Sequence, residues 1–301
     1  MPAYKLIPAC KDYLWGGDRL RTRFGVQSDL HPLAEAWVLS CHPDGACRMP
    51  DGTPLPDYLA AHPEALGTHG RQFSYFPVLI KLIDAHGDLS IQVHPGDDYA
   101  LAHEGQHGKV EMWVVLEAEP GAFLYYGFDH EISREEFAER IRSHTLTEVL
   151  HVEPVKRGDV FFIPAGTLHA ICHGIVVAEI QQSSNVTYRI YDYGRLGTDG
   201  KPRQLHIDQA LDVTTRGPVR QPAPTGHLGS CRYFTSDDRT APFTDTADDT
   251  SFVHLLVIEG TGTLTADGDT APLAPGDSYF LPAGSGTFRV EGNCRVIVTR
   301  I

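Results

Sequence analysis

One nine-residue pattern occurs twice in this chain of 301 residues and restricts the folds that the chain can adopt. The segments GDVFFIPAG, residues 158–166, and GDSYFLPAG, residues 276–284, share the pattern GDxxFxPAG. A glycine that opens a turn, a strand of aromatic core residues and a Pro-Ala-Gly corner that ends the strand are typical of β structure. The repeat therefore predicts two similar β units in one chain.

Most other apolar segments are short runs of β-branched and aromatic residues between Gly and Pro, as in LSIQVH, EMWVVLEAEP and CRVIVTRI. This spacing is typical of an antiparallel sandwich or barrel. Helical patterns are few. In SREEFAERI, Ser133 and Glu136 have the spacing of a capping box, and in LPDYLAAHPEAL we expect Pro63 to end or kink the first turns.

The paired motif resembles the two strand-turn motifs of the cupin superfamily, which are double-stranded jelly rolls whose barrel mouth often holds a metal. The resemblance implies a mainly β fold of two cupin-like jelly-roll β-barrels, with a few short helices inserted in the N-terminal part. The segment TTRGPVRQPAPT, residues 214–225, is rich in Pro and poor in large apolar residues. We therefore expect a metal-binding cupin domain over residues 1–218 and a degenerate cupin-like β domain over residues 219–301.

The composition excludes several classes of partner. A formal net charge of −14 argues against nucleic acid and anionic membranes, because those contacts need a basic surface. No run approaches the roughly 18 apolar residues of a membrane span, and the N-terminal segment is too polar for a secretory signal, so we expect a cytoplasmic protein. The six cysteines form no CxxC pair and are expected to be free thiols.

Four candidate metal ligands lie around the first copy of the repeat. Gln92 and His94 are spaced i, i+2 in LSIQVHP, so both side chains are expected on one face of a strand. Glu111 begins the next strong strand, and His169 lies three residues beyond the first PAG corner. Two imidazoles, a carboxylate and an amide oxygen suit Zn²⁺ and leave positions open for water or substrate. The second copy has Thr287 where the first has His169, so the second unit lacks this ligand.

Separated motifs in one order resemble those of type I phosphomannose isomerases over nearly the whole chain. They are WGG at residues 15–17, LSIQVHP followed by KxE, PAGTLHA and AEIQQSSNVTYRIYDYGR. The resemblance implies one zinc ion per chain, held by Gln92, His94, Glu111 and His169. It implies catalytic roles for Arg189, Glu179 and Lys109, and substrate-binding roles for Ser90, Lys81 and Asn185. Asn185 replaces an Asp that is common in the family.

The implied reaction matches the chemistry of these residues. Interconverting an aldose and a ketose moves a proton between C1 and C2 through an enediol, and a Lewis-acidic metal and a fixed guanidinium stabilise the developing negative charge. Lys, Arg and Ser are the usual partners of the phosphate group. Glu179 and Lys109 are alternative proton carriers. We therefore expect a zinc-dependent mannose-6-phosphate isomerase, monomeric or homodimeric, acting on a sugar phosphate.

Two other functions are compatible with a cupin fold. One is a metalloenzyme with a different metal or sugar phosphate, such as an iron dioxygenase or a cupin-type glucose-6-phosphate isomerase, but these sites usually use three His and one Glu. The other is a non-catalytic sugar-binding or regulatory module. Such a module would have lost its catalytic residues, whereas this chain retains all four ligands and Arg189. The preferred epimer and the role of the second unit stay open.

Overall fold

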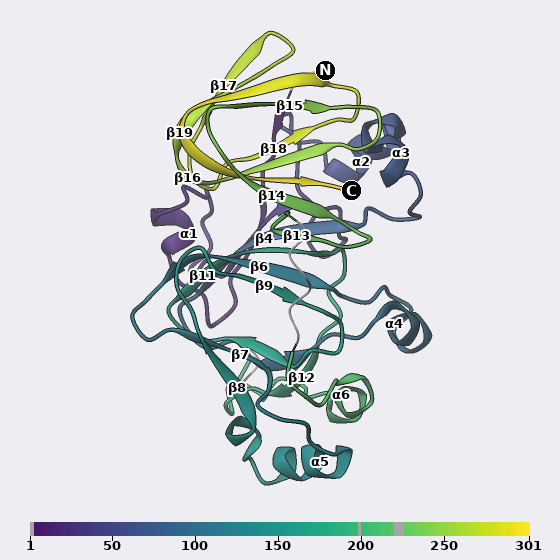
Figure 1. Ribbon diagram of the computed structural model, residues 1–301, viewed down its shortest axis with the longest axis vertical. Helices are drawn as coiled ribbons and strands as arrows, with labels where there is room; N and C mark the ends of the chain where they lie inside the picture. The colour runs from purple at the N-terminus through teal and green to yellow at the C-terminus, as the bar shows by residue number, and fades with distance from the viewer. Residues whose placement is uncertain (1–2, 198–199, 220–225) are drawn as a thin grey trace.

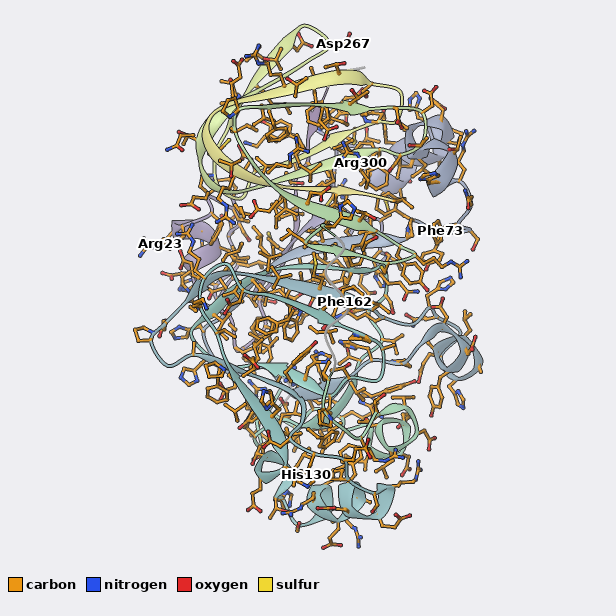
Figure 2. All side chains as sticks on the ribbon, in the orientation of Figure 1. Arg23, Phe73, His130, Phe162, Asp267 and Arg300 are labelled. Atoms are coloured by element: carbon orange, nitrogen blue, oxygen red, sulfur yellow. The ribbon has the colours of Figure 1, made fainter. Side chains whose placement is uncertain are left out.

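Three β-sheets follow one another along the longest axis of the molecule (Figure 1). The computed structural model describes residues 3–197, 200–219 and 226–301. An eight-stranded sheet occupies one end, a six-stranded sheet the middle, and a five-stranded sheet the other end. Phe162 lies near the middle of the molecule, with Arg300 on one side of it along this axis and His130 on the other (Figure 2).

The eight-stranded sheet is antiparallel and is formed mainly by the C-terminal part of the chain. Its strand order is β1-β18-β16-β19-β14-β13, with β15 paired to β19 and β17 paired to β16. The strands are β1 (Tyr4–Lys5), β13 (Gly229–Ser230), β14 (Thr235–Thr240), β15 (Phe243–Ala247), β16 (Val253–Ala266), β17 (Asp269–Leu273), β18 (Ser278–Leu281) and β19 (Gly286–Arg300).

The other two sheets face each other in the N-terminal part. The six-stranded sheet has the order β2-β3-β4-β11-β6-β9, with β2 (Ala9–Lys11), β3 (Glu35–Leu39), β4 (Val78–Ala85), β6 (Glu111–Ala118), β9 (Val160–Ile163) and β11 (Ile175–Gln182). The five-stranded sheet has the order β12-β5-β10-β7-β8, with β5 (Ile91–Val93), β7 (Phe123–Phe128), β8 (Leu150–Pro154), β10 (His169–Ile171) and β12 (Tyr188–Tyr191).

The predicted fold class is confirmed, but the two N-terminal sheets do not close into a barrel. The molecule is mainly β and its helices are short. However, among the strands that the structure describes, none hydrogen-bonds to both facing sheets. β2 and β9 stay at the edges of one sheet, and β12 and β8 at the edges of the other. The N-terminal part is therefore a sandwich of open sheets instead of a closed barrel.

The helices lie in the connections between strands. They are α1 (Arg19–Thr22), α2 (Leu55–Ala61), α3 (Gly67–Gly70), α4 (Asp97–His103), α5 (Arg134–Arg142) and α6 (Ile207–Val213), with 3₁₀ turns at Pro63–Leu66 and Leu146–Glu148. The predicted cap is present, because the Glu136 amide donates to Ser133 Oγ at 3.0 Å. α2 ends before Pro63, as expected. The described part of the chain contains no helix that could serve as a membrane span.

The repeated motif forms the same structure twice. φ is +93° at Gly158 and +85° at Gly276, a region that favours glycine, and β9 or β18 follows directly. Glu111 pairs with the last residue of β9, whereas Val253 pairs with the last residue of β18. The two registers are equivalent, so the C-terminal copy has an apolar side chain where the N-terminal copy has a carboxylate.

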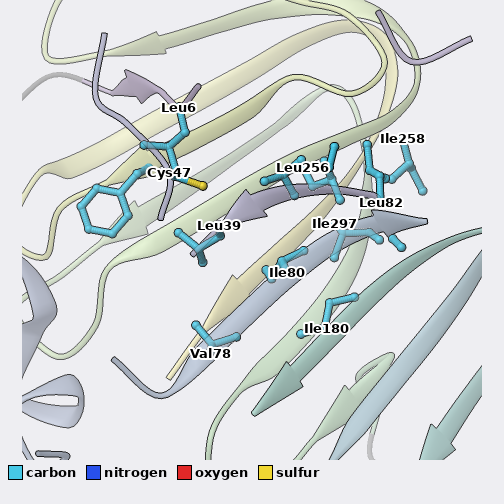
Figure 3. Close-up of a cluster of buried hydrophobic side chains, with 14 of the residues drawn as sticks. Leu6, Leu39, Cys47, Val78, Ile80, Leu82, Ile180, Leu256, Ile258 and Ile297 are labelled. Carbon is cyan, nitrogen blue, oxygen red and sulfur yellow. The ribbon is translucent and has the colours of Figure 1, made fainter. Parts of the chain in front are cut away.

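A shared core joins the eight-stranded and six-stranded sheets (Figure 3). Ile80 and Leu82 of β4 and Ile180 of β11 belong to the same cluster as Leu256 and Ile297 of β16 and β19. Each such side chain contributes about 1.5–3 kcal/mol when fully buried. β1 also pairs with β18, across the boundary predicted at residues 218/219. That division stays a prediction, and residues 220–225 of the proposed linker lie outside the described residues.

Candidate metal centre and active site

A cavity of about 260 Å³ opens between the six-stranded and five-stranded sheets. Side chains of both sheets and of neighbouring loops line it. The structure brings to this cavity all six residues predicted for catalysis and substrate binding and one predicted metal ligand: Lys81, Ser90, Gln92, Lys109, Glu179, Asn185 and Arg189. The other three predicted ligands lie beside Gln92 and Lys109, buried behind the cavity wall.

His94, Glu111 and His169 form a compact group of potential ligands. Their ligand atoms lie within 4.8 Å of one another, and all three side chains are buried. His169 Nε2 is 3.2 Å from Glu111 Oε1, and His94 Nε2 is 3.5 Å from Glu111 Oε2. The two imidazoles therefore approach the same carboxylate from β10 and from the end of β5.

Backbone contacts orient both imidazoles. His94 Nδ1 donates to the Val186 carbonyl and His169 Nδ1 donates to the Thr167 carbonyl, each at 2.9 Å. With the proton held on Nδ1, each Nε2 is unprotonated, which is the state that can bind a metal. Burial lowers the pKa of both rings, to about 4 for His169. Both rings are therefore neutral at pH 7, the form that binds metal.

Gln92 lies next to this group. It is the direct cross-strand partner of His169, and its amide Nε2 is 3.5 Å from His169 Nε2. A half-turn of the amide exchanges its nitrogen and oxygen, which presents an oxygen ligand on the same side. The structure therefore brings all four predicted ligands together.

Buried charges continue from the ligands along the cavity wall. Lys109 Nζ lies 2.7 Å from Glu111 Oε2 and 3.5 Å from Glu179 Oε1. Lys81 Nζ lies 3.1 Å from Glu179 Oε1 and 3.7 Å from Glu35 Oε2. With its three carboxylates ionised, this row carries one more negative charge than positive charges, so it favours a cation.

The donor set fits Zn²⁺. It offers two neutral imidazole nitrogens, a carboxylate and an amide oxygen, which suit this ion. Among the residues that the structure describes, no group donates a well-directed hydrogen bond to either oxygen of Glu111, although Lys109 pairs with one of them electrostatically. A buried carboxylate without such donors is stabilised by a bound cation.

Glu179 is held ionised by its neighbours. Burial raises the pKa of this carboxyl group, but Lys109 and Lys81 outweigh the effect, and the pKa is lowered below its ordinary value. Trp113 Nε1 also donates to Glu179 Oε2 at 2.9 Å. Glu179 can therefore accept a proton, but the two lysines make it a weak base.

Arg189 lines the same cavity from β12 and has different partners. It is the neighbour of Gln92 across β12 and β5, and its Nε donates to Ser90 Oγ at 3.3 Å. Among the described residues it has no ion pair with a carboxylate, since its other side-chain contact is the Gln204 carbonyl at 3.0 Å. Asn185 also lines the cavity, and its side-chain amide donates to Asp44 Oδ2 at 2.9 Å.

Comparison with known proteins supports the sequence resemblance. Residues 3–111 match the family description "Phosphomannose isomerase type I, catalytic domain", and residues 230–301 match "Mannose-6-phosphate isomerase, cupin domain". A mannose-6-phosphate isomerase of Streptococcus mutans is 36% identical over 309 residues, covering 95% of this chain and 94% of the relative. The chain belongs to the type I phosphomannose isomerase family.

Solved structures of the family share the whole fold. The mannose 6-phosphate isomerase of Bacillus subtilis superposes with a TM-score of 0.92 at 35% identity and covers all of both chains. A zinc-bound mannose 6-phosphate isomerase gives a TM-score of 0.81 at 19% identity and covers 99% of each chain. At that identity the second match shows the fold alone.

The phosphomannose isomerase motif WGG has a packing explanation. A Cβ atom on Gly16 would lie 2.5 Å from Ala34 Cα, and one on Gly17 would lie 2.4 Å from Asp84 Oδ2. Only glycine allows this segment to lie so close to its neighbours. The close approach places Trp15 in the wall of the cavity.

Sequence reasoning assigned no site role to eight residues that line the cavity: Tyr13, Trp15, Glu35, Ile83, Leu89, Thr187, Arg203 and His206. The sequence could have indicated Glu35, because it is a lone carboxylate in the otherwise apolar segment AEAWVL. It is buried and accepts a 2.6 Å hydrogen bond from Trp37 Nε1. Arg203 and His206 belong to the irregular connection between β12 and α6, where no periodic pattern shows which way a side chain points.

Proposed function

We propose that this protein is a zinc-dependent mannose-6-phosphate isomerase, which interconverts mannose 6-phosphate and fructose 6-phosphate by proton transfer between C1 and C2. The observation that supports it is the meeting of His94, Glu111 and His169 beside a cavity that Arg189 also lines, without a carboxylate partner among the described residues. Zinc, when bound, supplies a Lewis acid that stabilises negative charge on the substrate oxygens. The choice of zinc rests on the donor set of two neutral imidazoles, a carboxylate and an amide oxygen.

The distribution of cations supports one orientation of the sugar phosphate. Lys81 and Lys109 each pair with buried carboxylates, so their charge is already compensated. Arg189 has no such partner among the described residues. Arg203 lines the same cavity, where Asp192 holds it in place through a 2.7 Å hydrogen bond from its Nε. A phosphate carries about two negative charges and favours guanidinium partners. We therefore place the phosphate beside Arg189 and Arg203, with C1 and C2 toward Glu179 and Lys109.

Glu179 and Lys109 are the two candidates for the proton carrier, because both face the cavity. Glu179 is ionised and can accept the proton, whereas the Lys109 ammonium can donate one to a substrate oxygen. Arg189 and Ser90, joined by a hydrogen bond, order the substrate. The cytoplasmic location and the monomeric or homodimeric state stay predictions.

Turnover of a small panel of hexose 6-phosphates tests the proposal. We expect fructose 6-phosphate to form from mannose 6-phosphate, to stop with a chelator and to resume with zinc. The control variant is His169→Ala. A zinc-loaded parent no more active than this variant would favour a sugar-binding module, and activity confined to another hexose phosphate would favour a different cupin enzyme.

Replacing Arg203 tests the orientation. In Arg203→Gln we expect KM for mannose 6-phosphate, and the inhibition constant of inorganic phosphate, to rise about tenfold, because a charge-assisted contact is lost. kcat should change less than about threefold. Arg157→Gln is the control, because its ion pair with Glu259 lies outside the cavity. Equal KM values in both variants would contradict the placement of the phosphate.

A further inference from the structure

A hairpin of the C-terminal part reaches toward the candidate site. β13 and β14 form the edge of the eight-stranded sheet that lies next to β6 (Figure 1). A Cβ atom on Gly229 would lie 2.4 Å from Met112 Sδ, so the hairpin packs directly on β6. Phe234, in the turn of the hairpin, is buried in the core shared with the six-stranded sheet. This packing fixes the position of the neighbouring Tyr233.

Tyr233 contacts a carboxylate of the N-terminal part. Its hydroxyl donates to Asp97 Oδ2 at 2.7 Å. Asp97 Oδ1 accepts two further hydrogen bonds, from the Gly108 amide at 2.8 Å and from Gln182 Nε2 at 2.7 Å. Burial raises the pKa of Asp97, but these hydrogen bonds outweigh the effect and lower it. Asp97 is therefore an ionised acceptor that joins three separate segments.

Gly108 directly precedes Lys109, and its backbone is packed tightly. A Cβ atom on Gly108 would lie 2.4 Å from the carbonyl carbon of Gly96. The Lys109 amide donates to the Pro95 carbonyl at 3.0 Å. The backbone that carries Lys109 therefore lies against residues 95–97, and the Gly108–Asp97 hydrogen bond is one of its attachments.

We propose that Tyr233 is a positioning residue, which fixes the backbone of Lys109 through Asp97 and the Gly108 amide. The inference rests on the role of Lys109 in the proposed function. Among the described residues, no side chain beyond His206 lines the cavity. The C-terminal part thus contributes to the site indirectly, through the contact of Tyr233 with Asp97, which binds the backbone next to Lys109.

The first test compares two tyrosines of the C-terminal part. In Tyr233→Phe we expect kcat to fall about tenfold, because a small displacement of a reacting group is costly, while KM changes less than about twofold and zinc content stays at the parent value. The matched control is Tyr279→Phe, which removes a 2.8 Å hydrogen bond to the Pro272 carbonyl within the eight-stranded sheet. An equal loss of kcat in both variants would overturn the proposal.

The second test reports how well Lys109 is held in place, and it does not depend on measuring turnover. Lys109 is 5% exposed, so we expect acetic anhydride to acetylate it slowly in the parent and in Tyr279→Phe, and several-fold faster in Tyr233→Phe, as measured by peptide mass spectrometry. Parent-like acetylation in Tyr233→Phe would overturn the proposal. This test separates the two hypotheses, since failure of the proposed function would appear as absence of turnover in the parent itself.

A double-mutant cycle tests the route through Asp97. Asp97→Asn weakens the same connection, so the kcat losses of Tyr233→Phe and Asp97→Asn should not multiply in the double variant. Independent, multiplying losses would show that Tyr233 acts by another route and would contradict the proposal.

Discussion

Glu111→Gln is expected to lower zinc affinity at least about a hundredfold and kcat/KM by about a thousandfold. The substitution preserves the size of the side chain but removes the only formal negative charge among the four candidate ligands. The neighbouring imidazoles are neutral, so they cannot replace that charge. Lys109, which lies 2.7 Å from Glu111 in the parent, would lose this carboxylate and keep only Glu179 at 3.5 Å, so its positive charge beside the ion would be less well compensated.

Competition with a chromogenic chelator measures the affinity, and the isomerase assay measures turnover. Glu117→Gln is the matched control, because it makes the same change on the same strand outside the cavity. It should keep the zinc affinity and the activity of the parent. If Glu111→Gln held zinc as tightly as Glu117→Gln, Glu111 would not be a ligand.

Arg19→Met is expected to destabilise the fold by about 3–5 kcal/mol, because it leaves a buried carboxylate without its counter-charge. Asp84 is 0% exposed and accepts from Arg19 Nε at 2.8 Å and from the Arg19 amide at 2.8 Å. The guanidinium also donates to the carbonyls of Ala85, Gly174 and Ile175. These contacts anchor the end of the WGG segment on β4 and on the start of β11.

Urea unfolding measures this loss. Arg142→Met is the matched control, since its ion pair with Glu139 is exposed and should change stability by less than about 0.5 kcal/mol. Adding Asp84→Asn to Arg19→Met should recover part of the stability, because the penalty comes mainly from the stranded charge. A double variant less stable than Arg19→Met would point instead to lost packing.

The sequence correctly predicted features that depend on residues close together in the chain, such as strand faces, helix caps and turns. The i, i+2 spacing of Gln92 and His94 gave the correct face, because side chains alternate along a strand. The hydroxyl of Ser133 capped its helix, and the two GDxxFxPAG copies formed equivalent turns.

Features set by strand pairing and by contacts between distant segments could not be read from the sequence. Lys81 and Glu179 are direct partners across β4 and β11, nearly a hundred residues apart, and nothing local indicates that the lysine is paired. The family resemblance indicated a pocket, but not that its lysines are neutralised while Arg189 is not. Whether sheets close into a barrel depends on their edge strands, which the repeated motif does not specify.

The pairing of β1 with β18 has a consequence for biosynthesis. Tyr4 aligns with Phe280 and Lys5 with Tyr279, so the first strand has no hydrogen-bonding partner until the nascent chain has grown past that point. Pairing of such high contact order forms slowly, and unpaired strand edges attract other chains. Residues 4 and 5 can therefore take their place in the sheet only after residues 279 and 280 have left the ribosome.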